Sequence, residues 1–134
     1  MQISEVMHKD IKFANINDSI KTVAELMKSE DIGSAPVLDG QKAVGFVTDR
    51  DIVINCVAQG HDLNEPIRDA MSNKVFCVKE DSTLEEASKL MAEKQISRIV
   101  VLDRSEKPVG IVSLQDLTQE SEDLAEETLS RIKQ

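Results

Sequence analysis

Hydrophobic and polar positions along the chain form two successive blocks that have the same order. In the first block, the short stretch 11–13, with apolar residues on either side of a lysine, predicts a strand, and apolar residues at helical spacing run from Ile20 to Met27. Residues 17–19 supply N-cap side chains for that helix, and Gly33 suits a left-handed C-cap. Two strands at 35–38 and 43–48, a tight hairpin between them, and a helix from 49 to about 58 complete the block.

The second block repeats these elements. It predicts a strand at 75–78, a helix at 83–94 that begins with a Ser82–Glu85 capping box, strands at 99–102 and 108–113, and a helix from Leu114. Residues 118–134 are acidic with a loose apolar stripe, which predicts one more helix. That helix either packs on its own domain or a symmetry mate, or docks on another protein.

The two blocks align residue by residue, which identifies an internal duplication. Residues 7–39 match 71–103 at a spacing of 64, and 44–48 match 109–113 at a spacing of 65. Two copies are too few for a solenoid, so we predict a compact pair with a shared core and an approximate two-fold axis. The fold class is α/β, an α+β sandwich of two strand–helix–strand–strand–helix repeats. Its expected boundaries are repeat one at 1–60, a polar linker at 61–68, repeat two at 69–118 and an acidic helix at 119–134.

Composition narrows the class of protein. With 40% apolar and 31% charged residues, no Trp or Tyr and three Phe, the chain is typical of a globular protein with an aliphatic core. A net charge of −9 argues against nucleic-acid binding, because phosphate contact relies on a basic face. No apolar run approaches the roughly 18 residues of a membrane span, and the start lacks a signal-peptide pattern. We therefore expect a cytoplasmic protein without membrane insertion.

Few side chains offer catalytic or metal-binding chemistry. His8 and His61 fall in segments predicted to be exposed and solvated, and no nucleophile–base pair is visible. No carboxylate spacing suggests a metal cage, so we expect neither an enzyme nor a metal site. Cys56 and Cys77 lack motif spacing and are interpreted as reduced thiols, with a disulfide or a metal pair as alternatives.

One motif recurs where each block passes from its last strand to its last helix. It reads Gly, two apolar residues, a hydroxyl residue, two variable residues and Asp, and it begins at Gly45 and at Gly110. The hydroxyl and acid pairs are Thr48 with Asp51 and Ser113 with Asp116. Such pairs fit capping boxes, in which both groups satisfy main-chain amides of the first turn. They also fit a ligand-binding site, because a carboxylate can accept hydrogen bonds from ribose hydroxyls. The free amides of a helix start suit a phosphate, and glycine, which lacks a Cβ, lets a base or sugar approach the backbone. Both interpretations stay open.

Duplicated in this order, the pattern closely resembles the cystathionine-β-synthase (CBS) domain pair, also called a Bateman module. The resemblance covers about residues 3 to 118, with matching segments at 6–7, 32–37, 48–52 and 70–71. It implies a regulatory module without chemistry of its own, which holds an adenosine derivative in clefts between the copies. The implied ligands are AMP, ADP, ATP, S-adenosylmethionine or a cyclic dinucleotide.

The resemblance also implies roles for individual residues. It assigns the ribose hydroxyls to Asp51 and Asp116, and contacts with ribose or phosphate to Thr48 and Ser113. The apolar positions that would line adenine are Ile11, Ala35, Pro36, Val75 and Ile99.

Two arginines complete the candidate site. Arg98 stands where related modules place a phosphate-binding base, and its alternative is a surface arginine paired to an acid. Arg50 is either a further phosphate contact or a solvated helix residue. The sequence leaves open which cleft Arg98 serves. We expect a homodimeric sensor that acts on an effector protein in trans, and the competing hypothesis is a ligand-free assembly module whose hydroxyl–acid pairs only cap helices.

Overall fold

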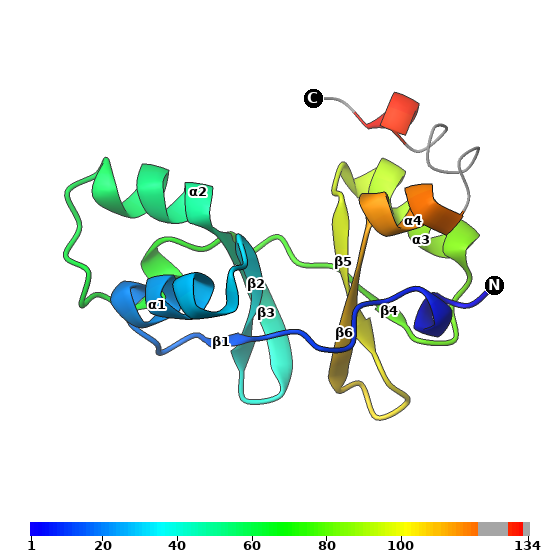
Figure 1. The fold of residues 1–134 in the computed structure, drawn as a ribbon, viewed down its shortest axis with the longest axis horizontal. Helices are drawn as coiled ribbons and strands as arrows, with labels where there is room; N and C mark the ends of the chain where they lie inside the picture. Colours follow the sequence, from blue (N-terminus) through cyan, green and yellow to red (C-terminus); the bar gives the residue numbers. More distant parts are fainter. Residues whose placement is uncertain (121–128, 133–134) are drawn as a thin grey trace. The chain divides into compact units, whose positions relative to one another are not determined.

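The chain forms two compact units, each with its own sheet and its own core. Unit 1 is Met1–Ile11 with Phe76–Gln134, and unit 2 is Lys12–Val75. The computed structural model describes residues 1–120 and 129–132 (Figure 1). Each unit has its own cluster of buried side chains, because each small sheet buries its apolar face under its own helices.

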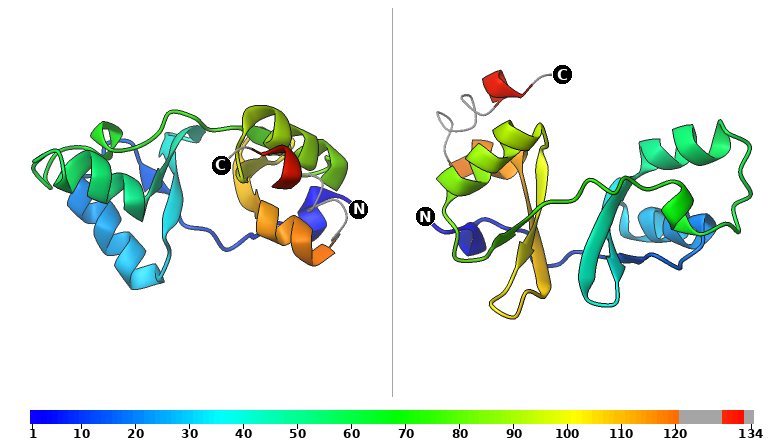
Figure 2. Two further views of the ribbon diagram at one scale, coloured as in Figure 1. Left: turned by 90° about the horizontal axis from the view of Figure 1, so that it is seen from above. Right: turned by 180° about the vertical axis from the view of Figure 1, so that it is seen from behind.

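Unit 2 is a three-stranded sheet with its helices on one face. Its elements are β1 (Ala14–Asn15), α1 (Ile20–Glu30), β2 (Ser34–Asp39), β3 (Lys42–Thr48), α2 (Asp49–Ile52), the π-helical turn η2 (Val53–Val57) and the 3-10 helix η3 (Ile67–Asp69). The strands lie in the order β1-β2-β3, with β1 parallel and β3 antiparallel to β2. Both α1 and α2 cover the same face of this sheet (Figures 1 and 2). The core between them is aliphatic, as predicted, and includes Ile20, Val23 and Val37.

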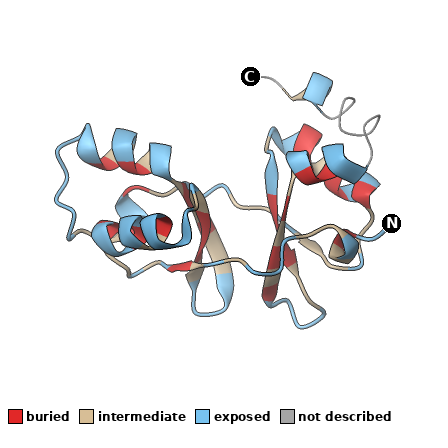
Figure 3. Cartoon of the chain, in the orientation of Figure 1, coloured by how far each residue is buried: buried red, intermediate tan, exposed pale blue. Residues whose placement is uncertain are grey.

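Unit 1 repeats this arrangement. Its elements are the 3-10 helix η1 (Ile3–Glu5), β4 (Cys77–Lys79), α3 (Leu84–Lys94), β5 (Arg98–Leu102), β6 (Pro108–Ser113) and α4 (Leu114–Glu120). The order is β4-β5-β6, again with one parallel and one antiparallel pairing. α3, β5 and β6 all contribute buried residues to the core of this unit (Figure 3). The α/β fold class with two β-α-β-β-α repeats is therefore confirmed.

Several element ends differ from the predicted ones. β1 occupies 14–15 rather than 11–13, and β4 occupies 77–79 rather than 75–78. The left-handed C-cap of α1 is Asp31, with φ 53°, so the helix ends before Gly33. The predicted helix 49–58 divides into α2 and the π-helical turn.

The N-cap of α3 also lies one residue later than predicted. Thr83 is the N-cap, and its capping-box partner is Glu86 rather than Glu85. The Thr83 hydroxyl accepts from the Glu86 amide at 3.2 Å, and the Glu86 carboxylate accepts from the Thr83 amide at 3.4 Å. Ser82 and Glu85 have the same spacing as Thr83 and Glu86, so the sequence allows two registers for the capping box, and the predicted one is wrong.

The segment that precedes the sheet of one repeat in the sequence packs in the unit that contains the sheet of the other repeat. Residues 1–11 belong to unit 1, with the second repeat, and the residues up to Val75 belong to unit 2, with the first. Ile3 is completely buried in the core of unit 1, among residues of the second repeat, while its equivalent Ile67 is buried in unit 2. The predicted linker 61–68 is not a free connection, since the Glu65 carbonyl accepts from the Ile20 amide at 2.9 Å. The compact units thus divide the chain after residues 11 and 75, whereas the predicted boundaries follow the sequence repeat.

The acidic C-terminal segment falls partly outside the described residues. α4 ends at Glu120, and residues 129–131 are helical. Ile132 packs against the core of unit 1, and the Gln95 side-chain amide donates to the Arg131 carbonyl at 3.1 Å. In this short stretch the chain packs on its own unit. Among the described residues, no helix combines the length and the apolarity that crossing a bilayer requires.

Candidate functional site

The site at Thr48 and Asp51 lies where β3 passes into α2. Thr48 has an extended backbone, with φ −116° and ψ 162°, which turns its hydroxyl back over the first helical turn. That hydroxyl accepts from the Asp51 amide at 3.0 Å, and Asp51 Oδ2 accepts from the Thr48 amide at 2.9 Å. The predicted capping box is confirmed here.

The cap uses only one of the two carboxylate oxygens of Asp51. Within the part of the chain that the structure describes, Asp51 Oδ1 has no hydrogen-bond or ion-pair partner, and the residue is half-buried. An ionised carboxylate accepts several hydrogen bonds on its two oxygens. Asp51 can therefore hold its helix start and still accept from a hydroxyl outside the chain.

Ser113 and Asp116 form the second capping box, between β6 and α4. The Ser113 hydroxyl accepts from the Asp116 amide at 3.2 Å, and Asp116 Oδ2 accepts from the Ser113 amide at 2.7 Å. In contrast to Asp51, the other oxygen is engaged, because His8 Nε2 lies 2.7 Å from Asp116 Oδ1. The side chain of Asp116 is only 8% exposed, and that of His8 is 66% exposed.

Sequence reasoning missed the role of His8. Its exposed position was predicted correctly, but it is not a freely solvated loop residue, since it pairs with a buried acid 108 positions away. His61 is also paired, with Nδ1 2.8 Å from Glu65 Oε2 on the surface. The alignment of the copies places Ser72 at the position of His8, and this difference was the available signal.

The glycine of each motif serves the fold rather than a ligand. A Cβ on Gly45 would lie 2.6 Å from the Ser72 carbonyl and 3.0 Å from Met71 Sδ. A Cβ on Gly110 would lie 2.7 Å from Met7 Sδ and 2.9 Å from the His8 carbonyl. The expected approach of a base or sugar to these glycines is therefore wrong: the chain's own methionine segments already occupy the space.

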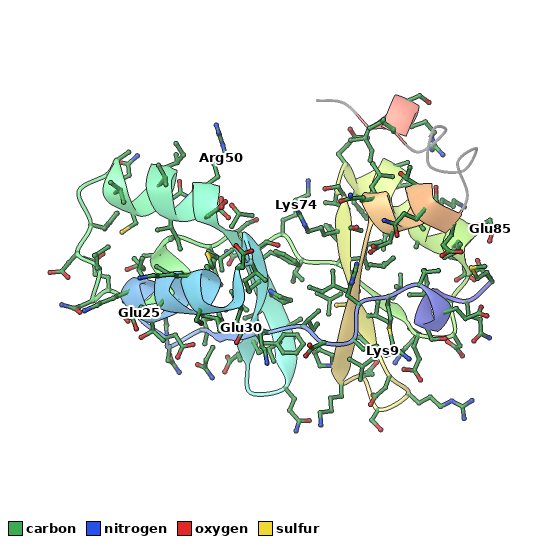
Figure 4. The ribbon with its side chains drawn as sticks, in the orientation of Figure 1. Lys9, Glu25, Glu30, Arg50, Lys74 and Glu85 are labelled. Atoms are coloured by element: carbon green, nitrogen blue, oxygen red, sulfur yellow. The ribbon has the colours of Figure 1, made fainter. Side chains whose placement is uncertain are left out.

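The structure puts Arg98 in the same unit as the second capping box. Arg98 begins β5 and lies opposite Ser113 in the antiparallel register, as Ser34 lies opposite Thr48 in unit 2. Its side chain is exposed, and no ion pair to an acid is found for it among residues 1–120 and 129–132. Arg50 is exposed at the start of α2 and points away from the ribbon, as expected of a solvated residue (Figure 4).

The residues predicted to line adenine differ in their accessibility. Ala35 and Ile99 are completely buried in the two cores, and Pro36 is also buried. Ala35 and Ile99 leave no exposed surface in the structure, main-chain atoms included. Ile11 and Val75 are half-buried, each at the end of a unit, and contacts with adenine stay a prediction for all of them.

Besides the capping boxes, the described part of the chain contains potential metal ligands and two cysteines. No group of three or more His, Cys, Asp or Glu side chains within them could hold a metal ion. Cys56 and Cys77 are free thiols, Cys56 being completely buried. Cys77 is exposed to solvent as a residue, but neighbouring atoms partly bury its thiol. This partial burial disfavours the charged thiolate and raises the pKa of the thiol above its ordinary value.

Comparison with known proteins agrees with this architecture. The model of the CBS domain family matches twice, at residues 3–57 and 67–123. The chain is 36% identical over 132 residues to the uncharacterized protein YlbB of Bacillus subtilis (97% of this chain, 85% of that protein). It is 36% identical over 115 residues to the CBS domain-containing protein YhcV of the same organism (86% and 81%). It is also similar to the solved CBS domain pair of protein MJ0100 in complex with 5′-methylthioadenosine and S-adenosyl-L-methionine, with a TM-score of 0.75, 26% identity and coverage of 90% of this chain and 98% of that one. With two family matches across most of its length, this chain belongs to the CBS domain family.

Proposed function

We propose that this protein is a regulatory module that binds an adenosine-containing ligand and transmits its occupancy to a partner protein. The observation that carries the proposal is the Asp51 carboxylate, whose Oδ2 caps a helix while its Oδ1 stays without a partner in the described chain. The related CBS domain pair of MJ0100 was solved with two adenosine derivatives, which supports the ligand class. AMP, ADP, ATP and S-adenosylmethionine are the candidates.

The chemistry of the motif suits a ribose. Both hydroxyls of the diol can donate to Asp51 Oδ1 and to the remaining lone pair of Oδ2, and bonds to an ionised acceptor are the stronger kind. The Thr48 hydroxyl contacts ribose or phosphate in this proposal, and Ser113 with Asp116 provides the corresponding groups in the second repeat. Arg98, opposite Ser113, is the phosphate contact, with Arg50 as a further one.

The competing candidate is a ligand-free assembly module, and one observation favours it: both hydroxyl–acid pairs form capping boxes. Asp51→Asn separates the two roles. The asparagine oxygen can still accept from the Thr48 amide, so the cap is retained, but the acceptor that faces the ligand becomes a donor.

Isothermal titration calorimetry with adenosine, AMP, ADP, ATP and S-adenosylmethionine tests the proposal. We expect binding of at least one compound to the wild-type protein and an affinity at least tenfold lower in Asp51→Asn, with the melting temperature nearly unchanged. Glu25→Ala is the matched control, since it also removes one negative charge from an exposed helix position in unit 2. Absence of binding across this panel contradicts the sensor proposal and leaves the assembly module.

Regulation requires that the ligand favours one conformation of the protein over another. A ligand shifts such an equilibrium only by its difference in affinity for the two states. We propose that the module is a cytoplasmic homodimer without catalytic chemistry, and that an effector protein reads its conformation. Light scattering with and without the bound compound measures the oligomeric state, and a monomer in both conditions contradicts the dimer.

A further inference from the structure

We infer that His8 is an internal competitor for Asp116, so that the two repeats bind a ribose with unequal affinity and the site at Asp51 fills first. This inference rests on the proposed function and adds the residue that regulates its second site. Both units offer an aspartate carboxylate to a ribose, and the two copies differ at the aligned position that holds His8 in unit 1 and Ser72 in unit 2.

Both oxygens of Asp116 are engaged in the protein. Oδ2 accepts from the Ser113 amide at 2.7 Å, and Oδ1 lies 2.7 Å from His8 Nε2. Since the Asp116 side chain is only 8% exposed, the imidazole covers part of the little surface through which a hydroxyl could approach. A ribose must therefore displace His8 before it can bind Asp116 as it would bind Asp51.

The imidazole is held in place by the backbone on which it sits. The His8 amide donates to the Ile111 carbonyl at 2.8 Å, and the Ile111 amide donates to the His8 carbonyl at 3.0 Å. Met7 lies against Gly110 beside this pair. Because the backbone of His8 is tethered next to β6, an imidazole that is displaced stays close to the carboxylate and rebinds readily.

Unit 2 supplies the internal comparison. Ser72 pairs with Phe46 through the same two backbone hydrogen bonds, both 2.9 Å long, and Met71 lies against Gly45. The Ser72 hydroxyl accepts from the Lys74 amide at 3.0 Å, and Asp51 Oδ1 stays without a partner in the described residues. The backbone geometry is thus the same in both units, and the side chain alone decides whether the second oxygen is covered.

The consequence can be expressed as a fold-change in affinity. A site that is competent for only a fraction of the time shows an apparent affinity reduced by that fraction. For a hydrogen bond between an imidazole and a buried carboxylate we expect a reduction of roughly tenfold, which corresponds to about 1.4 kcal/mol.

The experiment isolates each site in turn and uses adenosine, an uncharged probe that carries the ribose diol. Calorimetry compares Asp51→Ala with Asp51→Ala/His8→Ser, in which the second unit carries the serine of the first. We expect adenosine to bind the double variant roughly tenfold more tightly. The reciprocal pair is Asp116→Ala and Asp116→Ala/Ser72→His, for which we expect an affinity roughly tenfold lower in the double variant.

A third measurement uses the unaltered chain. With ¹⁵N-labelled histidine, NMR follows His8 Nε2 during titration with adenosine, and we expect half of its signal change at roughly ten times the free adenosine concentration that half-fills the Asp51 site. A signal that changes together with the first binding event overturns the order of filling, even where a variant fails to fold.

The remaining outcomes separate this inference from the proposed function. Binding to the wild-type protein that His8→Ser leaves unchanged overturns the inference alone. Weaker binding of AMP to His8→Ser, with adenosine unaffected, identifies His8 as a phosphate contact and also overturns it. Absence of binding of adenosine, AMP, ADP, ATP and S-adenosylmethionine in the wild-type protein and in every variant overturns the proposed function, and the inference falls with it.

Discussion

Gly45→Ala tests the close packing of residues 71–72 against β3. The added Cβ would lie 2.6 Å from the Ser72 carbonyl, which cannot rotate away as a side chain can. Residues 71–72 must therefore move, and this strains the two 2.9 Å hydrogen bonds between Phe46 and Ser72. Each bond contributes roughly 0.5–1.5 kcal/mol, and overpacking costs about 1–3 kcal/mol. Since movement relieves the overpacking as it breaks the bonds, we expect the free energy of unfolding to fall by roughly 2–3 kcal/mol.

Urea denaturation followed by circular dichroism measures this loss, and hydrogen exchange locates it in residues 12–75. Gly33→Ala is the matched control, because the nearest atoms to its Cβ belong to the exposed side chain of Asp49, with Oδ2 at 3.2 Å. We expect the control to stay within about 0.5 kcal/mol of the wild-type protein. If Gly45→Ala unfolds at the same urea concentration as the control, the packing argument for both motif glycines is wrong.

Three further predictions follow from the fold. Ile3→Ala should lower the free energy of unfolding by roughly 2–5 kcal/mol, and hydrogen exchange should show the lost protection in residues 76–120, because Ile3 is buried in unit 1. Thr83→Ala should cost about 1 kcal/mol in urea denaturation, whereas Ser82→Ala should be close to neutral; equal effects would contradict the observed cap. Cys77 should react with iodoacetamide more slowly in the folded protein than in urea, as mass spectrometry can measure, because its pKa is raised. The neutral thiol is favoured by folding, so this contribution to stability is present below the pKa of the unfolded thiol and is lost as the pH rises through the folded value.

Local patterns predicted most of the secondary structure, because the elements of each repeat depend on neighbouring residues. The hairpin strands β5 and β6 follow from periodicity, and the hydroxyl–acid spacing at the starts of α2 and α4 indicates capping boxes as one of two interpretations. The C-cap of α1 was not predicted correctly, since glycine is the usual residue with positive φ and the chain uses Asp31 instead. Its equivalent Gln95 has the same conformation, with φ 57°, so both copies break the usual preference at the same position.

The tertiary partners of the motif could not be read from either copy alone. Met7 and Met71 align with each other, as do Gly45 and Gly110, so the pattern allows each methionine to meet the glycine of its own copy or of the other. The structure pairs Met7 with Gly110 and Met71 with Gly45. For the same reason His8 was not connected with Asp116: a contact across 108 positions leaves no local periodicity in the sequence.

The duplicated motif therefore combines two kinds of constraint, and they act on different atoms. Its glycine leaves room for a methionine segment to pack against the strand, and its hydroxyl and one carboxylate oxygen cap the following helix. Substitutions at these groups therefore alter stability whether or not a ligand binds. The capping box does not use the second carboxylate oxygen, and the copies differ at this atom. Asp51 Oδ1 has no partner among the described residues, whereas Asp116 Oδ1 pairs with His8. Loss of binding in a Gly45 or Thr48 variant would consequently say little about recognition. A change confined to that oxygen, or to the residue that covers it, separates binding from folding because the capping bond stays in place.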